Sequence, residues 1–337
     1  MSESDNNQTR IYYEDDVDRS LLSGKTIAII GYGAQGRAHA NNLRDSKCNV
    51  VIGQRVGGRG FADAQEDGFE PVSIADAAKK ADLVNLLLPD EVHGKVYQSE
   101  IFPQLSAGNI VMTCHGFSFH YEFVKPSEGI ERVLVAPKGQ GHMVRSEYVK
   151  GGGVPCLIAV DEDSSDVTLQ MGLAYAAALG GTRAGVLQTT FAAETETDLF
   201  GEQAVLCGGV TSLVQAGFET LVEAGYQPEL AYFECLHELK IIVDLLYSRG
   251  MASMRDAISN TAEYGDYASG PRVIDQHVRD SMKKILQEIQ SGKFAKQFIE
   301  QHEAGDVELK KYREQNSDSE IERVGEKLRA MMPWLEQ

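Results

Sequence analysis

The sequence has little of what marks secreted, disulfide-bonded or zinc-bound proteins. Its 337 residues include five cysteines, an odd number, and no two of them have a CxxC spacing. We therefore expect neither a disulfide framework nor a zinc site, and a reducing cytoplasm is the natural compartment. The polar, acidic stretch 1–18 lacks the basic start and apolar core of a secretion signal. No apolar run looks long enough to span a bilayer, so we expect no membrane partner.

Positive charge is also scarce. The chain has 32 lysines and arginines against 50 acidic residues, which gives a formal net charge of −18. Such an excess of negative charge argues against nucleic acid and anionic membranes as partners. Anionic substrates would need local positive charge from helix N-termini, a few basic side chains or metal ions.

The N-terminal half alternates short apolar runs with segments of helical composition, such as 35–44 and 73–80. This alternation predicts a parallel sheet with helices on both faces, typical of an α/β fold. After about residue 190 the apolar runs give way to long helical stretches. We therefore predict two domains, 1–190 with a Rossmann-type sheet and 191–337 all-helical. The predicted strands are Thr26–Ile30, Asn49–Ile52, Asp82–Leu88, Asn109–Cys114, Arg132–Ala136, Pro155–Val160 and Ala184–Thr189.

A glycine motif follows the first predicted strand and opens a helix. In a Rossmann fold the first glycine permits a tight turn, the second admits a pyrophosphate, and the third lets helix and strand pack closely. The helix N-terminus adds partial positive charge. The pattern alone is weak, but its position in an alternating βα chain favours dinucleotide binding over a turn without function. The motif is Gly31-Tyr32-Gly33-Ala34-Gln35-Gly36.

The end of the second strand does not decide between NAD and NADP. An NAD site usually has an acidic residue there for the ribose hydroxyls, and residues 53–60 contain none. Arg55 and Arg59 could receive a 2′-phosphate, yet no serine or threonine completes a phosphate cradle.

Two pairs of carboxylates lie four residues apart in the helical half. Asp198 and Glu202 form one pair, and Glu234 and Glu238 form the other. On a helix each pair shares one face, and that face is otherwise apolar. No charged residue occurs over 203–218, which suggests a largely buried helix.

Buried carboxylates without partners are costly, so a cation must offset them. Hard oxygen ligands suit Mg²⁺, Mn²⁺ or Ca²⁺, and four carboxylates suffice for a two-metal site. A single acidic pair is more often an amphipathic accident. Two pairs on adjacent apolar helices favour a metal.

Three further residues are candidates for chemistry. His115 and Lys138 follow predicted strands, at the sheet edge that faces the cofactor in this architecture. His115 could be catalytic or an ordinary loop histidine, and Lys138 could neutralise substrate charge or lie at the surface. Ser259 could hold a substrate carboxylate or merely cap a helix.

Taken together, the motifs resemble the ketol-acid reductoisomerases, or acetohydroxy-acid isomeroreductases, of the short form (class I). The matches follow the family's order over nearly the whole chain. They comprise the glycine motif, Leu88-Pro89-Asp90-Glu91, His115-Gly116-Phe117, Ala136-Pro137-Lys138-Gly139, Glu194 to Glu202, Glu234 to Glu238, Ser259 to Gly265 and Met331-Met332-Pro333-Trp334.

The resemblance implies an enzyme of branched-chain amino-acid biosynthesis. It would isomerise 2-acetolactate or 2-aceto-2-hydroxybutyrate by alkyl migration and reduce the product to a 2,3-dihydroxy acid with a nicotinamide cofactor. Both carboxylate pairs would surround two Mg²⁺ ions, Ser259 would hold the substrate, and His115, Lys138 and Glu238 would be catalytic. The implied cofactor contacts are the glycine motif, Arg55, Gly58, Arg59, Gly60, Asp90, Glu91, Val92, His93 and Gly141.

The resemblance also implies a homodimer, or a higher oligomer built from it, with active sites shared between subunits. Asp198 and Glu202 would come from one chain, and Glu234, Glu238 and Ser259 from its partner. The helical domain would be knotted. NADPH-using relatives typically have serines where this chain has Gly58 and Gly60, so we expect NADH to be used well, with NADPH still accepted.

Two rival functions remain at this point. A 2-hydroxy acid dehydrogenase with a helical second domain would need neither isomerisation nor metal. Sensitivity of the activity to EDTA would therefore distinguish it from a ketol-acid reductoisomerase. A non-catalytic redox sensor that binds a dinucleotide would not need four buried carboxylates.

Overall fold

The structure is a computed structural model that describes residues 9–335. It consists of two compact units, one up to Thr197 and one from Asp198 onward, so that the boundary falls within helix α8 (Phe191–Gly201). Residues 1–8 of the acidic N-terminal stretch lie outside the described part.

The N-terminal unit contains an eight-stranded sheet in the order β1-β8-β7-β6-β5-β4-β2-β3. All seven predicted strands are confirmed. The two-residue strand β1 was not predicted, since it is too short to show a pattern. The sheet is also not wholly parallel, because β7 runs antiparallel to β6 and β1 antiparallel to β8. The strands are β1 Ile11–Tyr12, β2 Thr26–Ile30, β3 Asn49–Gly53, β4 Leu83–Leu86, β5 Ile110–Thr113, β6 Glu131–Pro137, β7 Cys156–Val160 and β8 Val186–Gln188.

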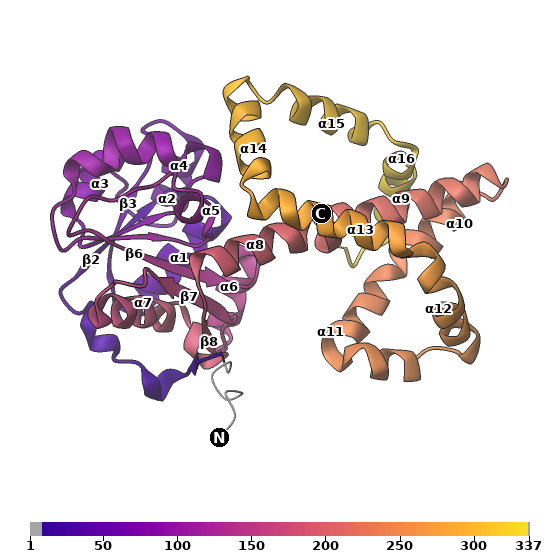
Figure 1. The fold of residues 1–337 in the computed structure, drawn as a ribbon, viewed down its shortest axis with the longest axis horizontal. Helices are drawn as coiled ribbons and strands as arrows, with labels where there is room; N and C mark the ends of the chain where they lie inside the picture. Colours follow the sequence, from indigo (N-terminus) through magenta and orange to yellow (C-terminus); the bar gives the residue numbers. More distant parts are fainter. Residues whose placement is uncertain (1–8, 336–337) are drawn as a thin grey trace. The chain divides into compact units, whose positions relative to one another are not determined.

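Strand β2 shows why both sheet faces must be covered. Ile27 and Ile29 point into a core that α1 (Ala34–Asp45) and α7 (Asp166–Leu179) help to form. Ala28 and Ile30 belong to a second core under α3 (Ile74–Lys80). Because side chains alternate along a strand, this continuous apolar run serves both cores. Figure 1 shows α3 and α7 on opposite sides of the sheet.

The helices of this unit begin and end at residues with clear local causes. The Ser73 side chain accepts from the Asp76 N–H at the start of α3, and Ser165 caps α7 in the same way. Gly180, with φ +94°, ends α7. The helices predicted at 35–44 and 73–80 are confirmed. The α-helices are α1 Ala34–Asp45, α2 Arg59–Glu66, α3 Ile74–Lys80, α4 Asp90–Val96, α5 Phe117–His120, α6 Gly141–Val149 and α7 Asp166–Leu179.

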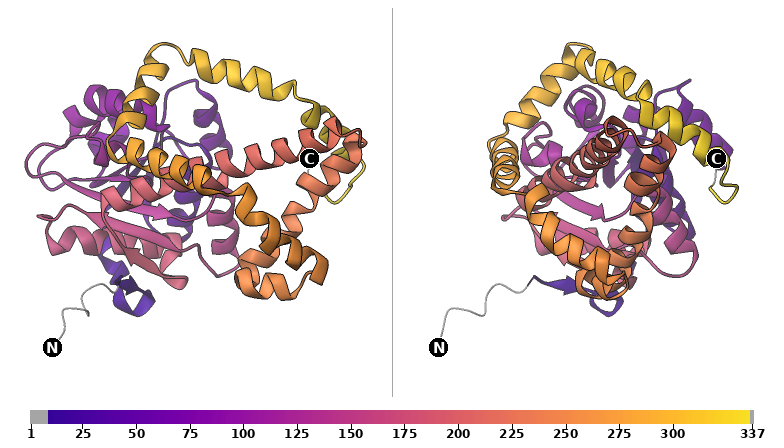
Figure 2. Two further views of the ribbon diagram at one scale, coloured as in Figure 1. Left: turned by 45° about the vertical axis from the view of Figure 1, so that its right-hand side comes forward. Right: turned by 90° about the vertical axis from the view of Figure 1, so that its right-hand side faces the viewer.

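The described residues of the C-terminal unit form helices and no strands, as Figure 1 and Figure 2 show. Two π-helical segments interrupt them, η6 (Glu202–Leu206) and η7 (Phe233–His237). A small core gathers Phe218, Tyr232 and Leu328. The helices are α9 Gly208–Glu223, α10 Pro228–Tyr232, α11 Leu239–Asp256, α12 Asn260–Val273, α13 Gln276–Gln290, α14 Lys293–Glu303, α15 Val307–Ser317 and α16 Glu320–Ala330.

The uncharged stretch 203–218 was predicted to be largely buried, but most of its side chains are exposed. Leu206 is 70% exposed and Leu213 51%, and only Ala204, Val214 and Phe218 are buried. The helical run Phe191–Glu223 is also long and apolar enough to cross a membrane by length and composition, contrary to our expectation from the sequence. One such helix is weak evidence for a membrane. Most side chains of residues 203–218 are exposed in the described chain, so the prediction of a largely buried helix is wrong.

Candidate active site

The glycine motif forms a tight turn between β2 and α1, and its three glycines meet different constraints. Gly31 has φ +104°, and a Cβ there would lie 2.5 Å from the Leu87 carbonyl oxygen. At Gly36 a Cβ would lie 2.2 Å from the Gly31 oxygen, so this glycine allows α1 to approach the loop. At Gly33 a Cβ would meet nothing within 4 Å. The open space beside Gly33 fits a ligand's pyrophosphate.

A cavity of about 470 Å³ lies beside this loop. The predicted residues Tyr32, Gly33, Ala34, Arg59 and Gly60 line it. Arg55 and Gly58 instead form the turn before α2, where the Gly58 N–H donates to the Arg55 oxygen at 3.1 Å. Three lining residues were missed by the sequence reasoning, because nothing in their spacing marks them; they are Arg37, Gln54 and Asp63.

Gln35 and Gly141 hold the loop against the turn after β6. The Gln35 side-chain amide donates to the Gly139 oxygen at 2.9 Å. A Cβ at Gly141 would lie 2.2 Å from the Ala34 oxygen. Gln35 and Gly141, both predicted to contact the cofactor, therefore hold the glycine motif in place through contacts within the chain.

The residues after β4 include a buried histidine, His93, and the half-buried Asp90. His93 is 2% exposed, and its ring nitrogens lie 2.9 Å from the Ser118 hydroxyl and 2.8 Å from the Leu88 oxygen. Burial lowers the pKa of His93 and raises the pKa of Asp90. Both changes disfavour the charged forms. Glu91 and Val92 lie beside them at the start of α4, and both are partly exposed.

A cluster of charged groups forms where β5 and β6 end and α8 begins. Glu194 is 1% exposed, and its carboxylate accepts from the Lys138 ammonium at 2.9 Å and from the Gly116 N–H at 2.8 Å. The His115 Nδ1 atom lies 3.4 Å from the same carboxylate. The structure therefore brings together His115 and Lys138, both predicted from sequence.

Glu194 is the member that sequence reasoning missed as a site residue. Burial by itself would raise its pKa, but His115 and then Lys138 outweigh that effect and hold the pKa of Glu194 below its usual value. The cluster is thus a buried carboxylate that orients a histidine and a lysine. The available signal was its position four residues before Asp198, on the same face of α8.

The four predicted metal ligands occupy helices but are not gathered in one chain. Asp198 is in α8, Glu202 begins η6, Glu234 lies in η7, and Glu238 follows η7 directly. Glu202, Glu234 and Glu238 are exposed, and within residues 9–335 no single group combines all four carboxylates at metal-binding distance. The predicted burial of both pairs is therefore wrong for the isolated chain. Both pairs adjoin π-helical segments, which are frequent at functional sites.

Ser259 is the N-cap of α12. Its hydroxyl accepts from the Ala262 N–H at 3.2 Å, and the residue is exposed. Ser259 therefore caps a helix, which was one of its two expected roles. A second role in holding substrate stays a prediction.

The glycine turn, the cavity beside it and the charged cluster at the strand ends together define a dinucleotide-binding oxidoreductase of the Rossmann type. A family model described as "Acetohydroxy acid isomeroreductase, NADPH-binding domain" matches residues 21–185, and one described as "Ketol-acid reductoisomerase, C-terminal domain" matches residues 191–334. The chain belongs to the ketol-acid reductoisomerase family. It is thereby an NAD(P)-dependent oxidoreductase and isomerase of branched-chain amino-acid biosynthesis.

One solved structure agrees with this assignment, and a second agrees with the fold. The NADH-preferring ketol-acid reductoisomerase from an uncultured archean is 45% identical, with a TM-score of 0.92, over 96% of this chain and 99% of that one. A semialdehyde dehydrogenase NAD-binding protein from Cupriavidus necator, solved with calcium and NAD, is 20% identical. Its TM-score is 0.59 over 79% of this chain and 99% of that one, and this likeness shows the fold alone.

Proposed function

We propose that this chain converts 2-acetolactate and 2-aceto-2-hydroxybutyrate into 2,3-dihydroxy acids by Mg²⁺-dependent alkyl migration followed by nicotinamide-dependent reduction. The observation that carries the proposal is the buried Glu194 carboxylate, which holds Lys138 and orients His115 at the carboxyl edge of the sheet. This edge is where substrate and nicotinamide meet in Rossmann enzymes.

The proposed metal ligands fit Mg²⁺ by their chemistry. Asp198, Glu202, Glu234 and Glu238 offer hard carboxylate oxygens, and neither pair contains a thiolate. When bound there, two Mg²⁺ ions supply Lewis-acid polarisation of the substrate's hydroxyl and carbonyl oxygens. The exposure of Glu202, Glu234 and Glu238 in one chain supports a site that another chain completes.

The protein's own residues move and hold protons in this scheme. Glu238 accepts the substrate hydroxyl proton on a carboxylate oxygen. The Lys138 ammonium donates a hydrogen bond toward the reacting oxygens, and its contact with Glu194 fixes its direction. His115 lies beside the same carboxylate, which holds its ring in place near the nicotinamide side. Ser259 holds the substrate through its hydroxyl, and its cap position fixes that side chain.

The cofactor in this proposal is NADH by preference, with NADPH accepted. The glycine loop, Arg59 and Gly60 line the cavity where the adenosine half would lie. Gly58 and Gly60 offer no hydroxyl to a 2′-phosphate. A relative that is 45% identical is described as NADH-preferring, which supports the same preference here.

The functional molecule in this proposal is a homodimer, or a larger assembly built from it, with shared active sites and a knotted helical domain. Large apolar side chains lie exposed on the C-terminal unit, including Leu206, Leu230 and Ile241. A second copy that covered them would bury both apolar surface and carboxylates. This explanation of the apolar run 191–223 needs no membrane, and we place the enzyme in the cytoplasm.

The test follows NADH and NADPH oxidation with 2-acetolactate, with and without Mg²⁺. We expect turnover that EDTA abolishes and Mg²⁺ restores, with a lower KM for NADH. Metal-independent turnover of a 2-hydroxy acid would favour a dehydrogenase. Dinucleotide binding without turnover of either acetohydroxy acid would favour a redox sensor.

A further inference from the structure

An arginine outside the predicted cofactor loop lines the adenosine-side cavity. Arg37 lies in the first turn of α1, directly after the glycine motif, and lines the cavity together with Gln54 and Arg59. In a Rossmann domain the ribose 2′ position lies between the glycine loop and the end of the second parallel strand. A free guanidinium there would favour NADPH, because the 2′-phosphate adds negative charge.

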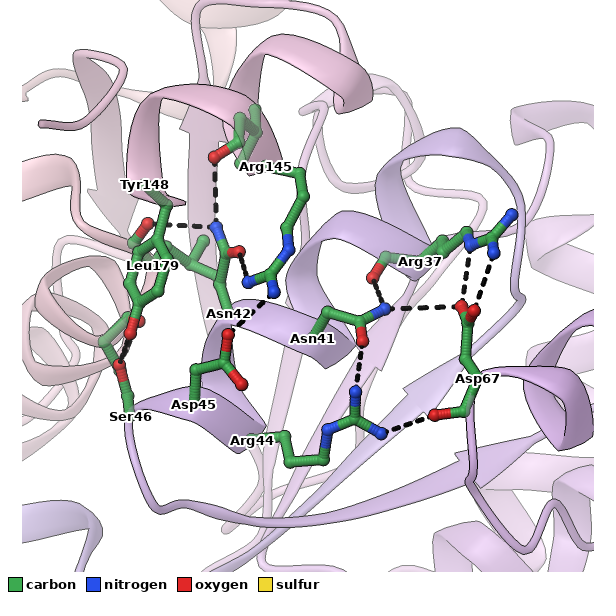
Figure 3. A network of polar contacts seen from close by, with 12 residues as sticks. Arg37, Asn41, Asn42, Arg44, Asp45, Ser46, Asp67, Arg145, Tyr148 and Leu179 are labelled. Carbon is green, nitrogen blue, oxygen red and sulfur yellow. Dashed lines mark hydrogen bonds and ion pairs between the residues drawn. The ribbon is translucent and has the colours of Figure 1, made fainter. Parts of the chain in front are cut away.

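Arg37 is not free, because Asp67 binds it through two nitrogens. The Arg37 Nε and Nη2 atoms each donate to the Asp67 carboxylate at 2.6 Å. Figure 3 shows this pair bridging from α1 to the residue that follows α2. The Arg37 side chain is 54% exposed, whereas that of Asp67 is 16% exposed. The carboxylate therefore fixes the arginine from the protein side.

Two more groups hold Asp67 in place. The Tyr32 hydroxyl donates to Asp67 at 2.8 Å, and the Asn41 amide donates at 3.4 Å. The hydrogen bonds from Arg37 are the main reason that the pKa of Asp67 lies below its usual value. Asp67 is thus charged at neutral pH.

The other arginine of the cavity is also beside a carboxylate. Arg59 lies 3.8 Å from Asp63, and both line the cavity. Each arginine of the cavity therefore has an acidic neighbour. Local neutralisation explains how a cavity with two arginines could accept a cofactor without a 2′-phosphate.

We propose that Asp67 is a specificity-determining residue, which binds Arg37 and thereby weakens NADPH binding relative to NADH binding. This inference rests on the proposed function for its cofactor pair and adds a residue that touches no cofactor itself. A paired guanidinium has two of its three nitrogens occupied, and its charge is largely compensated.

The test measures the Kd values of NADH and NADPH by nicotinamide fluorescence, without substrate. In Asp67→Asn we expect NADPH to gain about five- to tenfold over NADH, as expected for one partly exposed charge. Arg37→Gln should shift the ratio the other way, because it leaves Asp67 uncompensated. In the double variant the effect of Asp67→Asn should disappear.

A matched control is Asp45→Asn. Asp45 lies on α1, the helix that carries Arg37, and its carboxylate pairs with Arg145 at 2.7 Å. Neither Asp45 nor Arg145 lines this cavity. This control changes net charge equally and should leave the ratio unchanged. The proposal is overturned if Asp67→Asn leaves the ratio unchanged, if Asp45→Asn shifts it equally, or if the shift persists without Arg37. If Asp67→Asn fails to fold, an unchanged ratio in Arg37→Gln overturns it.

Binding is read without turnover, so failure here and failure of the proposed reaction are distinguishable. Enzyme that binds both cofactors but does not turn over 2-acetolactate contradicts the proposed function only. Active enzyme with an unchanged binding ratio contradicts only the role of Asp67.

Discussion

At the scale of single residues, the account depends on a buried carboxylate with two basic neighbours. His115 and Lys138 could be predicted because each directly follows a predicted strand, and that position is visible in a sequence. For Glu194 the sequence offered only its position four residues before Asp198, and its burial could not be predicted, because that burial depends on how α8 packs against the ends of β5 and β6. Arg37 was missed for a similar reason, since the cavity it lines forms only in the folded chain.

Replacement of Glu194 by glutamine should remove the charge that orients Lys138 and His115 while keeping the side chain's shape. We expect kcat to fall about a hundredfold or more with a smaller change in KM. Steady-state kinetics with 2-acetolactate check this. The control is Glu196→Gln on the same helix, whose partner is His120 at 3.5 Å. Equal losses in both variants would contradict the role given to Glu194.

His39 should make folding stability depend on pH. It is fully buried beside the Tyr175 hydroxyl at 2.8 Å, and burial lowers its pKa from 6.5 to about 3. Between pH 3 and pH 6.5 His39 is protonated in the unfolded chain but neutral in the folded chain. The free energy of unfolding therefore falls as the pH drops below 6.5. At pH 5.5 the loss should be about 1.4 kcal/mol.

Urea unfolding at pH 7.5 and pH 5.5, at one protein concentration, measures this effect. His39→Gln should lose about 1.4 kcal/mol less than the parent over this range. Equal losses in the two proteins would show that His39 does not titrate as its burial requires.

At the scale of elements, the sequence predicted the strands well and the helices of the C-terminal unit less well. Short apolar runs identify strands such as β2 regardless of direction, so the antiparallel course of β7 went unnoticed. Glu234 and Glu238 were expected to share one face of a regular helix, but the π-helical segment η7 lies between α10 and α11 and contains Glu234. Apolar periodicity does not distinguish a π-helical turn within a helix from regular helix.

Substitutions in the glycine motif can distinguish an effect on cofactor binding from an effect on folding stability. Gly33→Ala adds a Cβ with nothing within 4 Å and at a φ of −80°, so the fold should tolerate it. The same methyl would obstruct a pyrophosphate, and NADH binding should weaken at least about tenfold. Calorimetry for Tm and fluorescence titration for Kd test both parts.

Gly36→Ala is the matched variant, because its Cβ would clash with the Gly31 oxygen at 2.2 Å. It should lower stability by about 1–3 kcal/mol. If Gly33→Ala lowers Tm as much as Gly36→Ala, the space beside Gly33 does not belong to a ligand.

At the scale of the whole molecule, a single chain brings the residues of the nucleotide site together but does not gather the four proposed metal ligands. Composition and motif order predicted the family and the two fold classes, and both are confirmed. The domain boundary at residue 190, the knot and the dimer stay predictions. The burial expected for residues 203–218 is wrong for the single chain, because an uncharged, apolar composition does not by itself show whether other parts of the protein cover a helix.

The most direct test of the account purifies a mixed dimer from cells that co-express differently tagged Asp198→Asn and Glu234→Gln subunits. Each homodimer should be nearly inactive with 2-acetolactate and Mg²⁺. In the mixed dimer one site carries both substitutions and the other carries neither, so about half of the parent activity should return. If the isolated mixed dimer is as inactive as its parents, these carboxylates do not join across two subunits and the proposed shared metal site is wrong.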